Sequence, residues 1–390
     1  MRLTRAGVAT AIAVPALGVL AWLFGQPELA IVATALCAGL VAAGVSVRRH
    51  RPVLELRRHI RPARVAVEDP CQVVLSVRNT GRTRTSVLSL TDDVGRFGAA
   101  SLHLAPLPRG ATREATYSFP THRRGLHPVG PLTVETTDAF GLLRSRQTLS
   151  DTRTLIVVPR TVPLAELPPA PGDEPEHGAR VLSSAATVDE SFASMRPYTV
   201  GDDIRRIHWR TTARVGELVV RQHDQPWQRR TTVLLDVRRS AADDADAAFE
   251  RAVSAAASVI RSAAARHELV RLLSTDGDDS GFVALDDRAD ALMDRLAAVT
   301  PAPTSSLTAT VSQLDRRSTG RLVTCAMRLE QGEVDGWERG TTGFGVRVLV
   351  TTAGPAPTSQ RGVATVHWDG RRNLPEIWDP TVRSMGRVVR

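Results

Sequence analysis

Lysine is missing from this chain of 390 residues, so all 50 of its basic residues are arginines. The formal net charge of +9 therefore reflects a bias in residue choice. We find no helix-turn-helix, zinc-finger or aromatic-rich basic pattern beside it, so the charge does not predict binding to nucleic acid. The absence of lysine also excludes the Gly-rich P-loop of nucleotide-hydrolysing enzymes, because that motif requires one.

Cysteine is scarce as well. Cys37, Cys71 and Cys325 are isolated from one another, which predicts neither a disulfide framework nor a metal site. The sequence shows no pattern that pairs a nucleophile with a base, so we expect no enzymatic activity and no cofactor.

Two long apolar runs stand at the start of the chain. Residues 6–24 and 29–47 are each 19 residues long, carry no charge and are separated by Gly-Gln-Pro-Glu. Each run measures about 28 Å as a helix, close to the roughly 30 Å of a bilayer's hydrocarbon core. They predict a transmembrane hairpin over residues 1–47. The alternative is a cleaved signal peptide for the first run, but the second run would then still span.

Arginines flank both outer ends of this hairpin. Arg2 and Arg5 precede it, others follow at positions 48, 49, 51, 57, 58 and 61, and the turn carries only Glu28. Basic flanks remain on the cytoplasmic side of a membrane. We therefore expect a plasma-membrane protein whose termini and soluble domains are cytoplasmic, with the basic cluster beside anionic lipid headgroups.

Residues 48–160 predict a juxtamembrane segment followed by an all-β sandwich. Short runs of alternating apolar and polar residues are bounded by Gly, Pro and Asn, as in an antiparallel sandwich of about seven strands. Residues 159–176 are rich in Pro, Glu and Gly, which predicts an exposed connector, and we place a linker at 161–180. The remaining residues, 181–390, form the last domain.

The most distinctive motif begins that domain. An acidic residue and Phe precede the pattern R-x-Y-x-x-G-D-D-x-R-x-I-x-W, formed here by Glu190, Phe192, Arg196, Tyr198, Gly201, Asp202, Asp203, Arg205, Ile207 and Trp209. This stretch resembles the signature of the domain-of-unknown-function 58 family. A second segment, residues 123–143, also resembles that family. It departs from the family pattern at Ala139, where the family usually has Pro.

The types of residue in the signature favour a structural role over a catalytic one. Tyr198, Ile207 and Trp209 can bury apolar surface, and Asp202 and Asp203 can accept hydrogen bonds from neighbouring arginines. An Arg–Asp lattice would hold the segment against the following domain. A face for a partner protein and a catalytic role are the alternatives.

From residue 231 onward, strands and helices alternate. The pattern predicts strands near 231–236, 268–275, 281–287, 321–327, 346–352 and 364–368, helices at 242–266 and 287–298, and a helical tail. The resemblance implies a doubly wound domain of von Willebrand A type, which we expect behind an immunoglobulin-like sandwich. Ligands of such sheets lie beyond the carboxyl ends of the strands.

In metal-binding members of that superfamily, the loop after the first strand reads D-x-S-x-S. Here Asp236 and Ser240 are retained, but Arg238 replaces the first serine, and the strand at 321–327 is followed by no carboxylate. Mg²⁺ requires about six oxygen ligands. We therefore expect a degenerate site without metal, in which Arg238 pairs with Asp236.

Three classes of function remain. The resemblance implies a membrane-anchored, non-enzymatic adaptor that presents its von Willebrand A-like domain to a MoxR-type AAA ATPase, in chaperone-like or cell-envelope and stress processes. The alternatives are a structural envelope protein with its soluble part outside the cytoplasm and, least favoured, a hydrolase.

Overall fold

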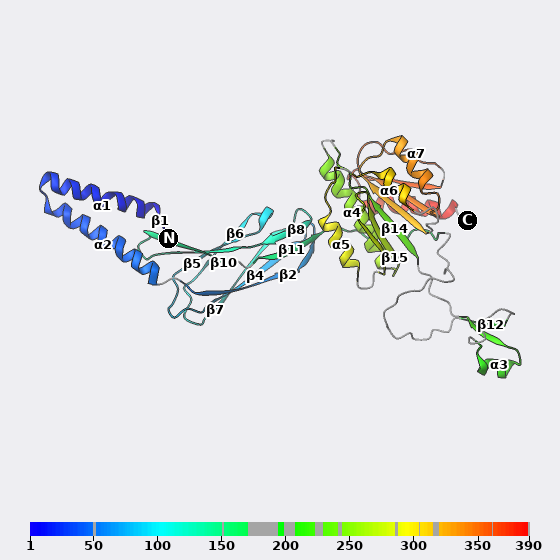
Figure 1. Ribbon diagram of the computed structural model, residues 1–390, viewed down its shortest axis with the longest axis horizontal. Coiled ribbons are helices and arrows are strands. Elements are labelled where there is room, and N and C mark those ends of the chain that lie inside the picture. Colours follow the sequence, from blue (N-terminus) through cyan, green and yellow to red (C-terminus); the bar gives the residue numbers. More distant parts are fainter. Residues whose placement is uncertain are drawn as a thin grey trace. The chain divides into compact units, whose positions relative to one another are not determined.

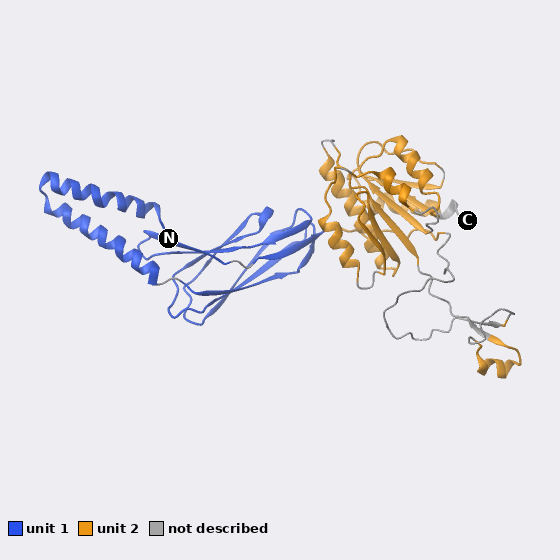
Figure 2. Cartoon of the chain, in the orientation of Figure 1, with its two compact units in different colours: residues 1–160 blue, residues 161–390 orange. Residues whose placement is uncertain are grey.

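The structure is a computed structural model of the chain. It describes residues 1–49, 52–149, 152–170, 194–198, 207–222, 229–240, 244–284, 288–303, 305–314, 320–360 and 362–388. The chain forms two compact units, residues 1–160 and 161–390 (Figure 2).

Two long helices begin the first unit: α1 (Arg5–Phe24) and α2 (Pro27–Arg49) (Figure 1). The Oγ1 of Thr4 caps α1 by accepting the Gly7 N–H at 3.0 Å. Gly25 ends α1 in the left-handed region (φ 62°), which glycine adopts without strain. Both helices are long and apolar enough to cross a membrane, so the two predicted apolar helices are confirmed.

A short strand ahead of α1 was not predicted. Strand β1 (Arg2–Leu3) pairs antiparallel with β10 (Leu143–Leu149), and the Oγ1 of Thr4 donates a hydrogen bond to the Gly141 carbonyl at 2.5 Å. The chain entering α1 and the chain leaving α2 therefore belong to one β body. Two residues are too few for an alternating pattern, so no local pattern predicts β1.

The β body contains three sheets. Its other strands are β2 (Leu54–Arg61), β3 (Arg64–Ala66), β4 (Pro70–Asn79), β5 (Leu88–Asp93), β6 (Ala99–Leu104), β7 (Thr112–Pro120), β8 (Gly125–Val129), β9 (Leu132–Thr137) and β11 (Arg153–Val158). The sheets run β1-β10-β9-β5-β6, β2-β4-β7 and β3-β11-β8. Within the described part of residues 1–160 this makes eleven strands, and β3 pairs with β11 in parallel, so the expected seven antiparallel strands were too few.

One apolar core lies between these sheets. The alternation in β4 buries Cys71, Val73, Leu75 and Val77, and they pack with residues of β5, β9 and β11. Cys71 is thus a small apolar core residue, as expected. Its buried surroundings raise the pKa of the thiol.

A buried ion pair crosses the core. Nη2 of Arg58 donates to Oδ1 of Asp92 at 2.6 Å, and the Tyr117 hydroxyl donates to Oδ2 of Asp92 at 2.6 Å. Both charged side chains are fully shielded from solvent. Burial and the hydrogen bond to Asp92 raise the pKa of Tyr117 well above its ordinary value.

The second unit begins with a segment that packs on the α/β domain. Leu164 and Leu167 are buried, and Nε of Arg321 donates to the Pro168 carbonyl at 3.1 Å. The indole N–H of Trp378 donates to the Ala165 carbonyl at 3.0 Å. The prediction of an exposed connector is therefore wrong for residues 162–170, and the rest of that stretch, 171–176, lies outside the described residues. Apolar residues spaced by prolines follow neither helix nor strand periodicity, so no pattern in the sequence predicts their burial.

A six-stranded sheet forms the centre of this unit. Its strands are β14 (Arg230–Leu235), β15 (Leu269–Ser274), β16 (Asp279–Ala284), β17 (Arg321–Ala326), β18 (Val346–Thr351) and β19 (Val363–His367). The order is β16-β15-β14-β17-β18-β19, and every neighbouring pair is parallel except β15 with β16. All six strands lie where the sequence predicted them, within a few residues.

Helices cover both faces of this sheet (Figure 1). They are α4 (Ala245–Ala264), α5 (Ala289–Ala298), α6 (Leu307–Gln313), α7 (Gln331–Gly340) and α8 (Leu374–Val388). Leu234 of β14 packs with residues of α6 and α7, so its neighbours Val233 and Leu235 point to the opposite face. Helices α6 and α7 were not predicted from the sequence. Helix α6 is only seven residues long, and α7 contains three glycines.

The signature segment contributes a small separate piece of structure. Strand β12 (Ser194–Pro197) pairs antiparallel with β13 (Val219–Gln222), and α3 (Trp209–Val215) lies between them in sequence. Gly216 ends α3 with φ 80°, a left-handed conformation suited to glycine.

Candidate functional site at the carboxyl edge of the sheet

The chain reverses its direction of winding at β14. It passes from β14 to β15 on one side and later places β17 on the other. In open α/β sheets, ligands bind beyond the carboxyl ends of the strands at such a switch point. The loop after β14, which carries Asp236, Arg238 and Ser240, is therefore the candidate site.

Asp236 is the buried acid of this loop, with only 2% of its surface exposed. Its backbone N–H donates to the Cys325 carbonyl at 2.8 Å, which joins the loop to the end of β17. The Thr275 hydroxyl donates to Oδ1 of Asp236 at 3.3 Å and accepts the Val237 N–H at 2.9 Å. A buried carboxylate requires such partners, and it also requires a neutralising charge.

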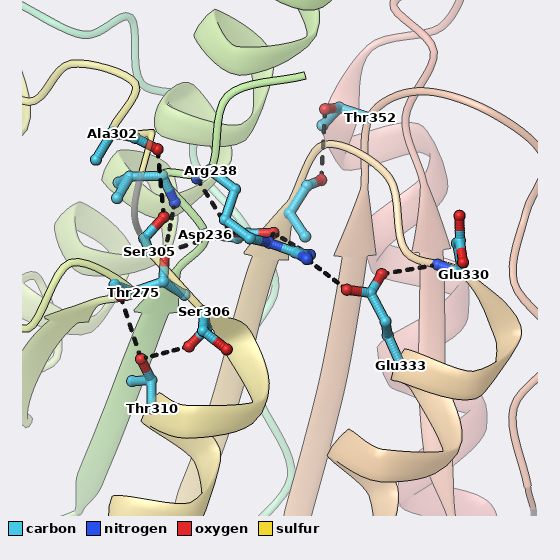
Figure 3. A network of polar contacts seen from close by, with 12 residues as sticks. Asp236, Arg238, Thr275, Ala302, Ser305, Ser306, Thr310, Glu330, Glu333 and Thr352 are labelled. Carbon is cyan, nitrogen blue, oxygen red and sulfur yellow. Dashed lines mark hydrogen bonds and ion pairs between the residues drawn. The ribbon is translucent and has the colours of Figure 1, made fainter. Parts of the chain in front are cut away.

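Arg238 provides that charge (Figure 3). Its Nε lies 3.0 Å from both carboxylate oxygens of Asp236, and its Nη2 lies 2.8 Å from Oδ2. The predicted Asp236–Arg238 pair is thus confirmed. The hydrogen bonds to Asp236 outweigh the opposing effect of burial and raise the pKa of Arg238, so the guanidinium is a permanent cation.

Glu333 completes the ion pair from another element. Nη1 of Arg238 contacts the Glu333 carboxylate at the start of α7. The other oxygen of Glu333 accepts the Glu330 N–H at 3.0 Å in a capping box. Burial alone would raise the pKa of Glu333, but these two hydrogen bonds prevail and lower it. One arginine therefore bridges the β14 loop and the first turn of α7, and we call this set the Asp236–Arg238–Glu333 bridge.

The donor set does not fit a hard divalent cation. The guanidinium of Arg238 covers both oxygens of Asp236, and β17 ends in Cys325 and Ala326 rather than in a carboxylate. Burial raises the pKa of Cys325 to about 12, so this thiol stays protonated. Among the residues that the structure describes, no three His, Cys, Asp or Glu side chains are grouped to hold a metal. Ser240 follows in the same loop and is half-buried.

Four signature residues fall within the described chain. Arg196 lies in β12 opposite Val220, and the Tyr198 N–H donates to the Leu218 carbonyl at 2.8 Å. Ile207 is buried as expected, whereas Trp209 at the start of α3 is 63% exposed. Glu190, Phe192, Gly201, Asp202, Asp203 and Arg205 lie outside the described residues, and so does the expected Arg–Asp lattice.

Sequence reasoning missed Glu333 and Thr275. Glu333 left one local sign, because Glu330 and Glu333 have the spacing of a capping box. For Thr275 the sequence contains no local motif, apart from its position after a predicted strand. Both residues are brought to Asp236 by the order of the strands, which no local pattern contains.

The strand order and the helices on both faces define an α/β domain of the doubly wound class. Residues 194–329 match a family model described as "Protein of unknown function DUF58", which confirms for this segment the resemblance carried by the signature residues. No curated protein matches the chain.

Several solved structures each resemble part of the chain. The CARDB domain of a Pyrococcus furiosus protein has 12% identity and a TM-score of 0.21, over 27% of this chain and 86% of that one. A β-glucosidase from Erythrobacter marinus has 17% identity and a TM-score of 0.17, over 25% and 15%. The alkylpurine DNA glycosylase of Pseudomonas fluorescens has 15% identity and a TM-score of 0.18, over 30% and 38%. At such TM-scores these likenesses carry no argument about function.

Proposed function

We propose that this protein is a membrane-anchored, non-enzymatic adaptor that presents a cytoplasmic von Willebrand A-like domain to a MoxR-type AAA ATPase. The observation that carries the proposal is the Asp236–Arg238–Glu333 bridge. It fills the ligand position of the sheet with a side chain of the same protein. A domain closed in this way is suited to binding a protein through its surface rather than a metal or a small substrate.

The order of the strands supports the domain type. Two strands, β15 and β16, lie on one side of β14 and three, β17 to β19, lie on the other, and the edge strand β16 is antiparallel. We assign this pattern to a von Willebrand A-like domain, and the three-sheet β body to an immunoglobulin-like sandwich. The MoxR-type partner follows from the family resemblance of the signature segment.

The helical pair supports the anchor. Helices α1 and α2 are apolar along their length, and β1 joins the β body that follows α2. Both outer ends of the hairpin therefore face the same side, and the arginine flanks favour the cytoplasmic side. The second candidate, a structural envelope protein, requires the opposite orientation. A hydrolase is disfavoured because Arg238 already occupies the buried carboxylate.

Co-purification tests the partner. The full chain, unit 161–390 and unit 1–160 would each be tagged and recovered from cells in mild detergent, and bound proteins would be identified by mass spectrometry. We expect an AAA ATPase with the full chain and with unit 161–390, and none with unit 1–160. Recovery of the ATPase with unit 1–160 alone, or of extracytoplasmic proteins only, would contradict the proposal.

A further inference from the structure

A cleft of about 600 Å³ opens in the first unit where α2 meets the β body. Its walls come from the last turn of α2, the stretch that leads into β5, and the turn that follows β9. Helix α2 is seated on the body beside β10, because a Cβ at Gly44 would lie 3.8 Å from the Leu143 side chain. Figure 1 shows this end of α2 next to β5 and β10.

The lining of the cleft is rich in hydroxyl groups. They include those of Ser89 and Thr137, while the Ser86 hydroxyl donates to the Val87 carbonyl at 3.5 Å. Asp138 also lines it, but its carboxylate accepts the Phe140 N–H at 2.8 Å and the Leu143 N–H at 2.5 Å, so its negative charge is directed into its own turn. The hydroxyls can donate hydrogen bonds to an anion.

The charge around the cleft is positive. Arg84 lies in the lining, and Arg82 stands two residues before it. Arg48 and Arg49 directly follow the lining residues Ser46 and Val47 in sequence. All four are exposed, and none forms an ion pair with another residue that the structure describes. Guanidinium groups pair well with phosphate oxygens because they donate two parallel hydrogen bonds.

The position of the cleft narrows the choice of ligand. Helix α2 has 23 residues and ends at Arg49, and a helix of this length spans about 34 Å, so its last turn falls where hydrocarbon gives way to headgroups. This step rests on the membrane attachment proposed above, and not on the ATPase. Val87 in the lining is 53% exposed, and Phe140 in the adjoining turn is 67% exposed. Exposed apolar side chains at this depth can contact acyl chains.

We propose that this cleft binds the headgroup of an anionic phospholipid. Arg84 and the surrounding hydroxyls contact the phosphate oxygens, while Val87 and Phe140 lie against the acyl chains. Such a lipid carries a negative charge, which matches the polar part of the lining, and acyl chains, which match its apolar part.

Native mass spectrometry of the full chain in detergent micelles tests the site. Phosphatidylglycerol and phosphatidylcholine would be added in equal amounts, and the lipid retained on the protein would be measured. We expect phosphatidylglycerol to be retained preferentially. Arg84→Gln should weaken its retention roughly tenfold, because a charge-assisted contact is lost. Ser89→Leu should weaken it by filling the cleft without changing the charge.

Arg96→Gln is the matched control. Arg96 is equally exposed but follows the far end of β5, so the variant removes the same charge away from the cleft. It should retain phosphatidylglycerol like the wild type, and all three variants should melt at the wild-type temperature.

Three outcomes would overturn the proposal. Equal losses in Arg84→Gln and Arg96→Gln would show a general effect of surface charge. Equal retention of the two lipids, insensitive to Arg84, would show only the lipid belt around the helices. Displacement of phosphatidylglycerol by inorganic phosphate at a similar concentration would make the ligand a soluble anion instead of a lipid.

Discussion

At the carboxyl edge of the sheet, a single side chain supplies the positive charge that two carboxylates share. Arg238 is only two residues from Asp236, so the pair forms within one loop, whereas Glu333 comes from α7. Removing one partner of such a pair leaves the other charge unmatched in a partly dry site. The bridge therefore holds the loop and α7 together and also keeps the acid covered.

Arg238→Ser should uncover oxygen ligands for a divalent cation. In the native protein we expect no specific heat when Mg²⁺ or Mn²⁺ is titrated into unit 161–390. In Arg238→Ser the carboxylates of Asp236 and Glu333 lose their shared cation, and together with the Thr275 hydroxyl, which contacts Asp236, they offer hard oxygen ligands. Titration calorimetry should then detect weak binding.

Arg239→Ser is the control for this prediction, since Arg239 is the exposed neighbour in the same loop. It loses the same charge and should bind no metal. Tight binding by the native protein, abolished in Asp236→Ala, would mean that Arg238 leaves the acid when a metal is present.

Because the chain has no lysine, raised pKa values of buried cysteine and tyrosine side chains should have a clear effect on its stability at alkaline pH. Cys325 and Tyr117 have raised pKa values in the folded state. Each therefore adds stability below its ordinary pKa, and that stability is lost as the pH rises toward the folded value. For Cys325 the window runs from about 8.5, its ordinary value, to about 12.

We accordingly expect the free energy of unfolding to fall with rising pH above about 8.5, by up to roughly 1.4 kcal/mol per pH unit for each such group. Guanidinium unfolding of the full chain in detergent, followed by tryptophan fluorescence at pH 7 to 11, measures this slope. Cys325→Ala should flatten it, because this variant removes the buried thiol. An unchanged slope in Cys325→Ala would refute the assignment.

At the scale of elements, the sequence predicted what depends on local pattern. The apolar runs of β14, β17 and β18 located the sheet, and the charge two residues after Asp236 predicted its ion pair. The contacts of Glu333 and Thr275 with this loop depend on strand order, so no local periodicity reports them. The segment 162–170 was missed for a related reason, because its burial depends on Trp378 and Arg321, which lie far along the chain.

That segment should determine the stability of the isolated α/β unit. A fragment of residues 161–390 keeps Leu164 and Leu167 buried, whereas a fragment of residues 171–390 loses both. Complete burial of a leucine contributes about 1.5–3 kcal/mol, so the shorter fragment should unfold at a clearly lower denaturant concentration. Within the longer fragment, Leu164→Ala should also destabilise by about 2–5 kcal/mol. Leu218→Ala, at a 42% exposed position, should have little effect. Equal midpoints for the two fragments would show that the segment only rests on the surface.

At the scale of the whole molecule, orientation in the membrane decides which partners the soluble units can meet. We expect a green fluorescent fusion after Arg390 to glow and an alkaline phosphatase fusion at that position to be inactive. Phosphatase inserted at Gln26, in the turn between α1 and α2, should be active. The physical reason is the arginine excess on both outer flanks of the hairpin. The reverse pattern would favour the envelope protein and remove the ATPase from consideration.

The pairing of β1 with β10 also imposes an order on biosynthesis. Strand β1 is made before α1, but β10 follows long after α2 has left the ribosome. The edge of the sheet beside β10 therefore cannot be completed until β10 is made. Strand β1 has to stay available for pairing while both helices insert. A hairpin that fails to insert would leave β1 displaced and this edge unpaired, and unpaired edges promote aggregation. On the membrane attachment proposed above, insertion of the hairpin would act as a checkpoint for folding of the β body.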